Sequence, residues 1–166
     1  MILRPAKAQD ASALIAIQNP VIRESAITFN PIEKSEADMV AYIEAAPCFL
    51  VAEAKGQVLG FATYDQFRKG QGYARTVEHT IVLAEGARGR GVGRALMAAI
   101  EDHARTAGMG SIWAGVSGEN PAGVAFHARL GFEEVARLPN VGYKFGRWMD
   151  LVLMRKWLDD ADGSSN

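Results

Sequence analysis

Between a β-branched segment and an amphipathic one, the chain reads Arg88-Gly89-Arg90-Gly91-Val92-Gly93. The preceding residues, Arg75–Leu83, predict a strand, and the following ones, Arg94–Ala107, predict a helix with one apolar face. Glycines let the backbone approach a ligand closely and aim successive N–H groups at it. The N-terminus of the following helix favours an anion, and arginines in and beside the turn add positive charge. The turn therefore predicts a cradle for a pyrophosphate.

Two common phosphate-binding motifs do not match this turn. A Walker A loop ends in Gly-Lys-Ser/Thr, and neither the lysine nor the hydroxyl is present here. A dinucleotide fingerprint needs glycine at the sixth place of G-x-G-x-x-G, and counting from Gly89 that place is Arg94. A glycine-rich turn with solvated arginines remains as an alternative. The strand before the turn and the strong helix after it make that alternative the weaker one.

The predicted elements on either side of the turn define the fold class. In chain order they are a strand at 1–4, a helix around 11–18, a helix after the Ser35/Asp38 capping box, strands at 49–54 and 57–67 joined by Lys55-Gly56, the strand 75–83, the helix 94–107, a strand at 112–116, a helix at 121–129, and strands at 132–138 and 148–157. The order is β-α-α-β-β-β-α-β-α-β-β. It predicts one α/β domain over residues 1–158, with a mixed, mostly antiparallel sheet flanked by helices.

Composition limits the possible partners. With 18 basic and 19 acidic residues the formal charge is −1, so no charge bias attracts the chain to nucleic acid or to an anionic membrane. The first ten residues lack the apolar stretch of a signal peptide, and no segment approaches about 20 apolar residues. The polar end, 159–166, predicts a disordered tail.

The cysteine and histidine content predicts a cytoplasmic protein without a metal. The single cysteine, Cys48, lies in an apolar run and is expected to be a small buried hydrophobe, which fits a reducing compartment. The three histidines and this cysteine show no metal-ligand spacing. His103 is expected on the solvated face of its helix.

The turn matches Q/R-x-x-G-x-G/A, the acetyl-CoA loop of the GNAT superfamily of N-acetyltransferases. Four further stretches resemble the phosphinothricin / methionine sulfoximine acetyltransferase group: Thr76–His79, Ser117–Asn120, His127–Phe132 and Val141–Leu151. The likeness covers roughly residues 2–157. It implies an enzyme, commonly a homodimer, that moves an acetyl group from acetyl-CoA to the amino group of a small amino acid or analogue.

The resemblance also implies which residues form the site. Glu78 matches the family's proposed base, and His127 stands where many members carry a tyrosine proposed to protonate the departing thiolate. The residues expected to hold acetyl-CoA are Ile81, Val82, Leu83, Arg88, Gly89, Arg90, Gly91, Val92, Gly93, Arg94 and Asn120. Structural alternatives stay open: a strand-end carboxylate paired with a base for Glu78, and a packing residue for His127. His79 alternates to the face opposite Glu78 and is expected to be structural.

Substrate recognition is expected from the first helices and the loop Phe67–Tyr73. Phe29, Arg68 and Tyr73 are the candidates, with core packing as an equal alternative for Phe29. Relatives often read aromatic-Arg-x-Thr-Val-Glu before the catalytic strand, whereas here Arg75 stands one place later. Because successive strand residues point to opposite faces, Arg75 is expected to face the other side of the sheet from the arginine of relatives. The identity of the substrate therefore stays open.

The aromatic and basic cluster Gly142–Trp148 predicts a dimer interface or a substrate rim. For the chemistry, we expect direct transfer from acetyl-CoA to an amine that Glu78 deprotonates, because Cys48 lies outside the motif region. Two alternatives remain: a protein N-acetyltransferase and a non-catalytic acyl-CoA-binding module.

Overall fold

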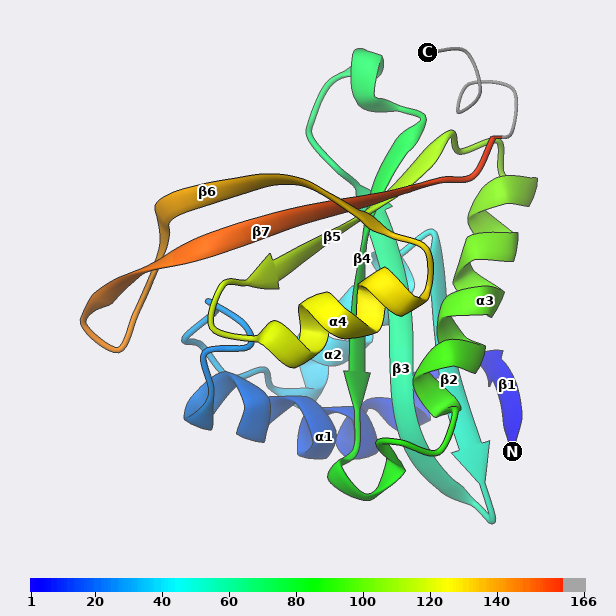
Figure 1. The fold of residues 1–166 in the computed structure, drawn as a ribbon. Helices are drawn as coiled ribbons and strands as arrows, with labels where there is room; N and C mark the ends of the chain where they lie inside the picture. The colour runs from blue at the N-terminus through cyan, green and yellow to red at the C-terminus, as the bar shows by residue number, and fades with distance from the viewer. Residues whose placement is uncertain (160–166) are drawn as a thin grey trace.

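The computed structural model describes residues 1–159, which form one seven-stranded sheet with helices on both faces (Figure 1). The strands lie in the order β1-β2-β3-β4-β5-β7-β6, and every neighbouring pair is antiparallel except β4 and β5. This confirms the predicted fold class. The strands are β1 (Ile2–Pro5), β2 (Cys48–Ala54), β3 (Gln57–Gln66), β4 (Thr76–Leu83), β5 (Ser111–Ser117), β6 (Glu133–Lys144) and β7 (Arg147–Trp157). The helices are α1 (Ala11–Glu24), α2 (Glu36–Ala45), α3 (Val92–Thr106) and α4 (Pro121–Arg129), with short 3-10 turns η1 (Ala8–Asp10), η2 (Gln71–Tyr73) and η3 (Glu85–Ala87). Of the predicted tail 159–166, residues 160–166 lie outside the described part.

Two apolar clusters cover the two faces of the sheet. On one face Leu96, Met97 and Ile100 of α3 are fully buried in the larger cluster. On the other, Leu14 of α1 and Met39 of α2 are buried in the smaller one. Successive strand residues point to opposite faces, and β4 supplies Ile81 and Leu83 to the first cluster and Val82 to the second. The faces of β4 are therefore an α3 face and an α1 face. None of the helices in residues 1–159 is long and apolar enough to span a membrane.

Local signals in the sequence set most of the element boundaries. Ser35 and Asp38 form the predicted capping box at the start of α2. Helix α3 begins at Val92, two residues earlier than predicted, because Gly91 adopts a left-handed conformation (φ 80°) and serves as its N-cap. Cys48 is 6% exposed, as expected of a buried hydrophobe. His103 is exposed, but its Nδ1 also lies 2.6 Å from the Tyr64 hydroxyl.

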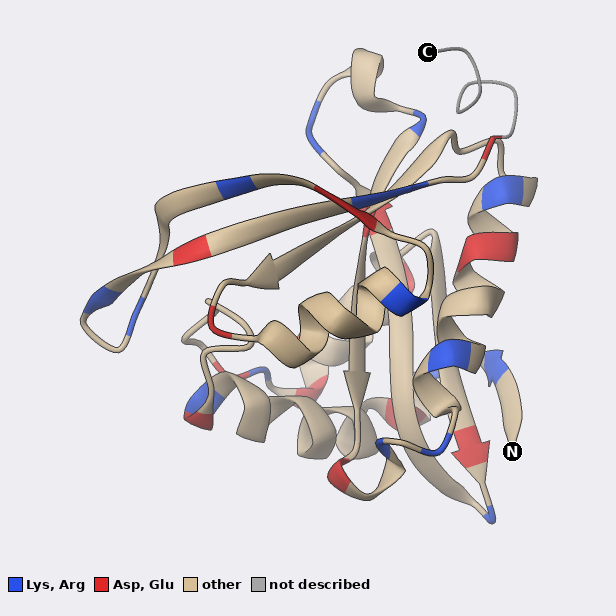
Figure 2. Ribbon diagram, viewed as in Figure 1, with Lys and Arg blue, Asp and Glu red and all other residues tan. Residues whose placement is uncertain are grey.

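The last two strands form a longer hairpin than the sequence predicted (Figure 1). The sequence predicts a strand that ends at Leu138, before Pro139 and Asn140. Strand β6 instead continues to Lys144 across an irregularity at which Asn140 takes a positive φ of 54°. The tight turn falls at Phe145 and Gly146, with φ of 53° and 73°. The cluster Gly142–Trp148 is therefore the tip of this hairpin, where Figure 2 shows basic residues.

Strands β4 and β5 run side by side only at their beginnings. They pair at three positions, from Thr76↔Ser111 to Glu78↔Trp113, and then diverge (Figure 1). Strand β4 continues along β3 as far as Leu83, while β5 stays paired with β7 as far as Ser117. Within residues 1–159 the β5-facing edge of β4 beyond Glu78 therefore has no strand partner. At 3.3 Å per residue this edge is about 16 Å long.

Candidate active site

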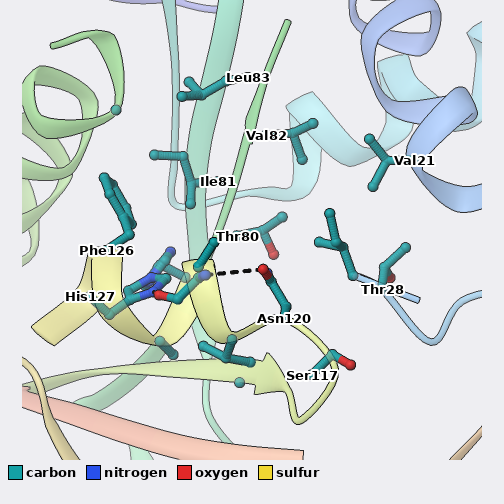
Figure 3. A pocket seen from close by; sticks show the side chains of 18 of the residues that line it. Val21, Thr28, Thr80, Ile81, Val82, Leu83, Ser117, Asn120, Phe126 and His127 are labelled. Carbon is teal, nitrogen blue, oxygen red and sulfur yellow. Dashed lines mark hydrogen bonds between the residues drawn. The ribbon is translucent and has the colours of Figure 1, made fainter. Parts of the chain in front are cut away.

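A cavity of about 780 Å³ occupies the opening between β4 and β5. Figure 3 shows Val21 and Thr28 on one side of Ile81, Phe126 and His127 on the other, and Asn120 at the end of the cavity between them. We name the two sides by their helices. The α1 wall consists of Gln18, Val21, Ile27, Thr28, Phe29 and Asn30, with Glu78, Thr80 and Val82 of β4. The α4 wall consists of Asn120, Ala122, Gly123, Phe126, His127, Arg129 and Leu130, with His79, Ile81 and Leu83 of β4 and the turn before α3.

The glycine-rich turn closes one end of the α4 wall. Gly89 and Gly91 take positive φ values of 72° and 80°, a conformation that glycine adopts without strain. Gly93 lies against its neighbours so closely that an added Cβ would stand 3.1 Å from the Phe126 ring and 3.3 Å from the Leu83 side chain. Glycine at 93 therefore lets α3 pack directly on β4 and α4. The N-terminus of α3 faces the cavity at this point, which favours an anionic ligand.

The arginines of the turn divide into two groups. Arg88 and Arg94 line the cavity, and Figure 2 shows the basic residues gathered before and at the start of α3. Arg90 does not line the cavity, and its Nη1 donates a hydrogen bond to the Gly86 carbonyl at 3.3 Å. Val92 is 2% exposed and packs in the core. A cofactor contact for Arg90 or Val92 therefore stays a prediction, because neither residue lines the cavity.

Within residues 1–159 the side-chain carboxylate of Glu78 has no partner. It is half-buried on the α1 face of β4, and no residue of 1–159 forms a hydrogen bond or ion pair with it. Gly115 of β5 makes room for it, because a Cβ at that position would stand 3.1 Å from Glu78 Oε2. Burial raises the pKa of the Glu78 carboxyl. The alternative role for Glu78, a carboxylate paired with a nearby basic residue, therefore finds no such residue within 1–159.

His127 and His79 form a buried pair on the α4 wall. His127 Nδ1 lies 2.7 Å from the Gly123 carbonyl, and the two Nε2 atoms are 3.0 Å apart. A carbonyl only accepts, so His127 Nδ1 carries a proton that it donates, and Nε2 of the neutral ring accepts one from His79 Nε2. His79 Nδ1 is then an unprotonated, buried atom without a partner in residues 1–159. Burial lowers the pKa of His127, and burial together with His127 lowers that of His79 to about 3.

Asn120 positions the start of α4. Its Oδ1 accepts a hydrogen bond from the Gly123 backbone at 3.0 Å, shown by the dashed line in Figure 3, and Pro121 follows as the first helical residue. The residue also lines the cavity, as do Ile81, Val82 and Leu83 beside the unpaired edge of β4. These predicted cofactor residues are thus brought together with the turn.

Of the four predicted substrate residues, the structure brings only Phe29 to the cavity. Phe29 belongs to the α1 wall and packs against the hairpin, where a Cβ at Gly142 would overlap its ring. Arg68 and Tyr73 lie in the β3–β4 loop, with the guanidinium 5.9 Å from the ring centre, at the opposite end of β4 from the turn (Figure 1). Arg75 donates to the Gly108 carbonyl at 3.1 Å, on the α3 side. A substrate role for these three residues stays a prediction.

Sequence reasoning missed several residues that shape the site. Gln18 lies in the buried stripe of α1, and its polarity within an apolar pattern was the available signal. Gly115 gave no signal, because its importance depends on the carboxylate of a neighbouring strand. The contact between His79 and His127 joins residues 48 positions apart and was not predictable from periodicity. No group of three or more His, Cys, Asp or Glu in residues 1–159 is placed to hold a metal ion.

Known proteins share both this sequence and this fold. The L-methionine sulfoximine/L-methionine sulfone acetyltransferase of Pseudomonas paraeruginosa is 34% identical over 95% of this chain and 94% of its own. The phosphinothricin N-acetyltransferase of Streptomyces coelicolor is 35% identical, over 90% of this chain and 92% of its own. The structure of yncA from Salmonella typhimurium, solved with acetyl-CoA, superposes with a TM-score of 0.90 at 33% identity and covers 96% of this chain and 95% of its own.

The model of the acetyltransferase (GNAT) family matches residues 19–132, which contain the turn, both β4 and β5, and most of the cavity. The resemblance inferred from sequence is therefore confirmed: this chain belongs to the GNAT family of acetyltransferases.

Proposed function

We propose that this acetyltransferase moves the acetyl group of acetyl-CoA to the amino group of a small amino-acid-like substrate of the methionine sulfone, methionine sulfoximine or phosphinothricin type. The names of the relatives support this class of substrate. The observation that carries the proposal is the single cavity that joins the glycine-rich turn to the unpartnered Glu78 through the opening between β4 and β5. A ligand at the turn and an amine at Glu78 can thus meet from opposite faces of the sheet.

The α4 wall fits acetyl-CoA, which supplies an activated thioester when bound. Positive-φ glycines and the N-terminus of α3 suit its pyrophosphate, and Arg88 and Arg94 add charge there. The unpaired edge of β4 offers backbone N–H and C=O groups to an extended amide-bearing arm, as an added strand would use them. We assign the coenzyme to this wall on those grounds.

Glu78 is our proposed general base. A substrate amine is mostly protonated at neutral pH and must lose a proton before it can attack a thioester. The Glu78 carboxylate faces the α1 wall, accepts no hydrogen bond from residues 1–159, and has a pKa that burial moves toward neutrality. It can therefore take a proton from an amine that reaches it directly or through one water.

The role of His127 stays a prediction. In this arrangement both of its ring nitrogens are engaged, one by the Gly123 carbonyl and one by His79. To protonate a departing thiolate, the ring must take up a proton and its Nε2 must leave His79. The observed geometry supports Glu78 more directly than it supports His127.

We further propose a homodimer that uses the tip of the β6–β7 hairpin. Tyr143, Phe145 and Trp148 are each more than half exposed, which is unusual for three neighbouring aromatic residues. The tip itself contacts the α1 wall, because Lys144 Nζ donates to the Thr28 carbonyl of that wall at 2.8 Å, and also to the nearby Ser25 carbonyl at 2.7 Å. Contacts at the tip would thus be transmitted to the substrate side of the cavity.

The remaining assignments extend the same proposal. A cytoplasmic location agrees with a single, buried cysteine. The near-balanced charge supports a small-molecule acceptor without a nucleic-acid or membrane partner.

The test combines binding and turnover. Calorimetric titration with acetyl-CoA should give a one-site isotherm, and thiol release should then be measured across a panel of amino acids, methionine sulfone, methionine sulfoximine and phosphinothricin among them. Saturable, amine-dependent thiol release is the expected result. Coenzyme binding without thiol release from any member would refute the proposed acceptor class and favour a protein acceptor, which a peptide panel would then detect.

A further inference from the structure

The loop that follows helix α1 forms much of the α1 wall. Its four consecutive residues 27–30 line the cavity, whereas the helix itself contributes two residues to that wall. Residues 25–35 contain no helix or strand, so no regular backbone ladder fixes their position. The shape of the acceptor side of the cavity therefore depends on whatever else holds this loop.

The loop's own hydrogen bonds are short-range. The N–H groups of Ile27, Asn30 and Ile32 each donate to a side-chain oxygen two positions earlier, at 3.3, 3.3 and 3.0 Å. Bonds of this kind shape a loop locally but do not attach it to the rest of the molecule. An attachment must come from a distant segment.

Lys144 at the tip of the β6–β7 hairpin supplies that attachment. Its ammonium donates to the Ser25 carbonyl at 2.7 Å and to the Thr28 carbonyl at 2.8 Å, across 119 and 116 positions of the chain. The tip lies on the same side of the molecule as the C-terminal end of α1 (Figure 1). Within residues 1–159 no other hydrogen bond joins residues 25–32 to a distant segment.

The surroundings of Lys144 are unusual for a lysine. The residue is 3% exposed, and no carboxylate of residues 1–159 forms an ion pair with it, although lysines are almost never fully buried unless paired. The two loop carbonyls compensate the buried ammonium through charge-assisted hydrogen bonds, which are stronger than neutral ones. Next to them, Gly142 makes room for Phe29, because a Cβ there would overlap the ring. The hairpin thus holds the loop by one polar and one apolar contact.

Resting on the proposed function, we propose that Lys144 is a positioning residue for the amine substrate, which it serves by holding residues 25–30 in the conformation that forms the α1 wall. Lys144 does not line the cavity, so it acts through the loop. Without its two hydrogen bonds the loop would hold this conformation for only part of the time, and the apparent affinity for the substrate would fall by that fraction. A saturating substrate would restore the conformation, so turnover would be kept.

Two variants test the two contacts separately. Lys144→Met removes the ammonium and keeps the length of the side chain, and Gly142→Ala displaces the Phe29 ring by overlap. KM and kcat for methionine sulfone are measured at saturating acetyl-CoA, together with the Kd of acetyl-CoA. If the released loop is correctly placed about a tenth of the time, KM rises about 10-fold while kcat stays within about 2-fold and Kd is unchanged.

Lys156→Met is the matched control. Lys156 Nζ donates to Glu101 Oε2 at 2.7 Å on the α3 side of the sheet, and Glu101 is buried, so this variant also destabilises the fold by removing a lysine from a buried partner. It should leave KM unchanged. Hydrogen exchange of the backbone amides in residues 25–30 gives a second readout: we expect faster exchange in Lys144→Met and the wild-type rate in Lys156→Met.

Two outcomes would overturn the inference. One is a normal KM in Lys144→Met and Gly142→Ala when urea unfolding shows that both are folded. The other is an equal rise in KM for Lys156→Met, because KM would then follow global stability. A wild-type enzyme inactive on the whole amino-acid panel would overturn the proposed function and the substrate role of Lys144 with it, while hydrogen exchange would still test whether Lys144 holds the loop. An active wild type with silent hairpin variants overturns the inference alone.

Discussion

The two walls of the cavity differ in how their polar groups are satisfied. On the α4 wall the Asn120 carboxamide caps a helix and His127 uses both ring nitrogens. Among the buried side-chain nitrogen and oxygen atoms of this wall, within residues 1–159, His79 Nδ1 alone has no partner. On the α1 wall the Glu78 carboxylate and the Gln18 amide oxygen have no partner in the same residues. The buried polar side chains of the α4 wall are therefore largely satisfied by the fold, which leaves the unpaired backbone edge of β4, the turn and its arginines for a coenzyme. The α1 wall retains the unpaired Glu78 carboxylate beside the cavity, which suits deprotonation of an acceptor.

The largest effect is expected from Glu78→Gln. Loss of the base should lower kcat/KM by about 10²–10⁴-fold near pH 7, while the nearly isosteric amide leaves acetyl-CoA affinity unchanged. The loss should shrink as pH rises, since more of the substrate then arrives deprotonated. Because burial raises the pKa of Glu78, the acidic limb of the wild-type profile should lie above that of an ordinary glutamate. Steady-state kinetics across pH measures both effects.

His127→Ala is the comparison for this experiment. A proton-donating role for His127 predicts a loss of activity that does not shrink at high pH, in contrast to Glu78→Gln. If Glu78→Gln is folded, binds acetyl-CoA and turns over at a near-normal rate at pH 7, Glu78 is not the base.

A smaller effect, confined to binding, is expected at the turn. Gly91→Asp places a negative charge beside the proposed pyrophosphate site, and Gly91→Asn introduces a side chain of the same shape without the charge. Both side chains tolerate the left-handed conformation (φ 80°) better than most. We expect the aspartate to bind acetyl-CoA about 10–30-fold more weakly than the asparagine, by calorimetry. Equal affinities in two folded variants would remove the pyrophosphate from this turn.

The buried pair of His79 and His127 predicts that the folded protein becomes less stable in acid. Both pKa values are lowered in the folded state, so the unfolded chain binds more protons below its ordinary histidine pKa of about 6.5. Stability is then complete above that pH and decreases as the pH falls. The folded pKa of His79 is about 3, so lowering the pH from 7 to 5 should decrease the free energy of unfolding by roughly 2 kcal/mol through this residue alone. Urea unfolding should show a shallower pH dependence for His79→Leu, and an unchanged slope would contradict the pairing.

The smallest effect on the single chain is expected at the hairpin tip. Trp148 is 60% exposed and packs edge-on against Tyr143, with ring centres 5.0 Å apart. Trp148→Arg should leave the fold intact but reduce association, because it puts charge into an aromatic contact surface. Light scattering at micromolar concentration should give twice the mass of one chain for the wild type and a lower mass for the variant. A wild-type monomer would exclude the proposed interface.

Local signals made the fold and the α4 wall largely predictable. A strand, positive-φ glycines and a helix N-terminus are consecutive in the chain, so the 88–94 turn and its helix were predicted together. The capping box of Ser35 and the Pro121 helix start are equally local. The predicted end of β6 was wrong because pairing with β7 resumes at Gly142, beyond the irregularity that contains Pro139 and Asn140.

The α1 wall was harder to predict because its features depend on contacts between distant segments. Room for Glu78 comes from Gly115 on another strand, and the loop beside Phe29 is held by Lys144 from the hairpin. Arg68 and Tyr73 lie in the loop before β4. Whether they reach the active-site cavity depends on which end of β4 borders that cavity, and only the three-dimensional structure shows this. Sequence alternation did predict that Arg75 turns away from the face of Glu78, and the structure places it on the α3 side.

The most direct test of this division between the walls is a pair of measurements on two variants, Glu78→Gln and Gly91→Asp: the Kd of acetyl-CoA, and turnover at saturating acetyl-CoA. We expect opposite patterns in the two variants. Glu78→Gln should bind acetyl-CoA normally and lose turnover, whereas Gly91→Asp should bind weakly and recover turnover once the coenzyme saturates it. Loss of acetyl-CoA affinity in Glu78→Gln, or a turnover defect in Gly91→Asp that saturation does not restore, would contradict the separation of tasks.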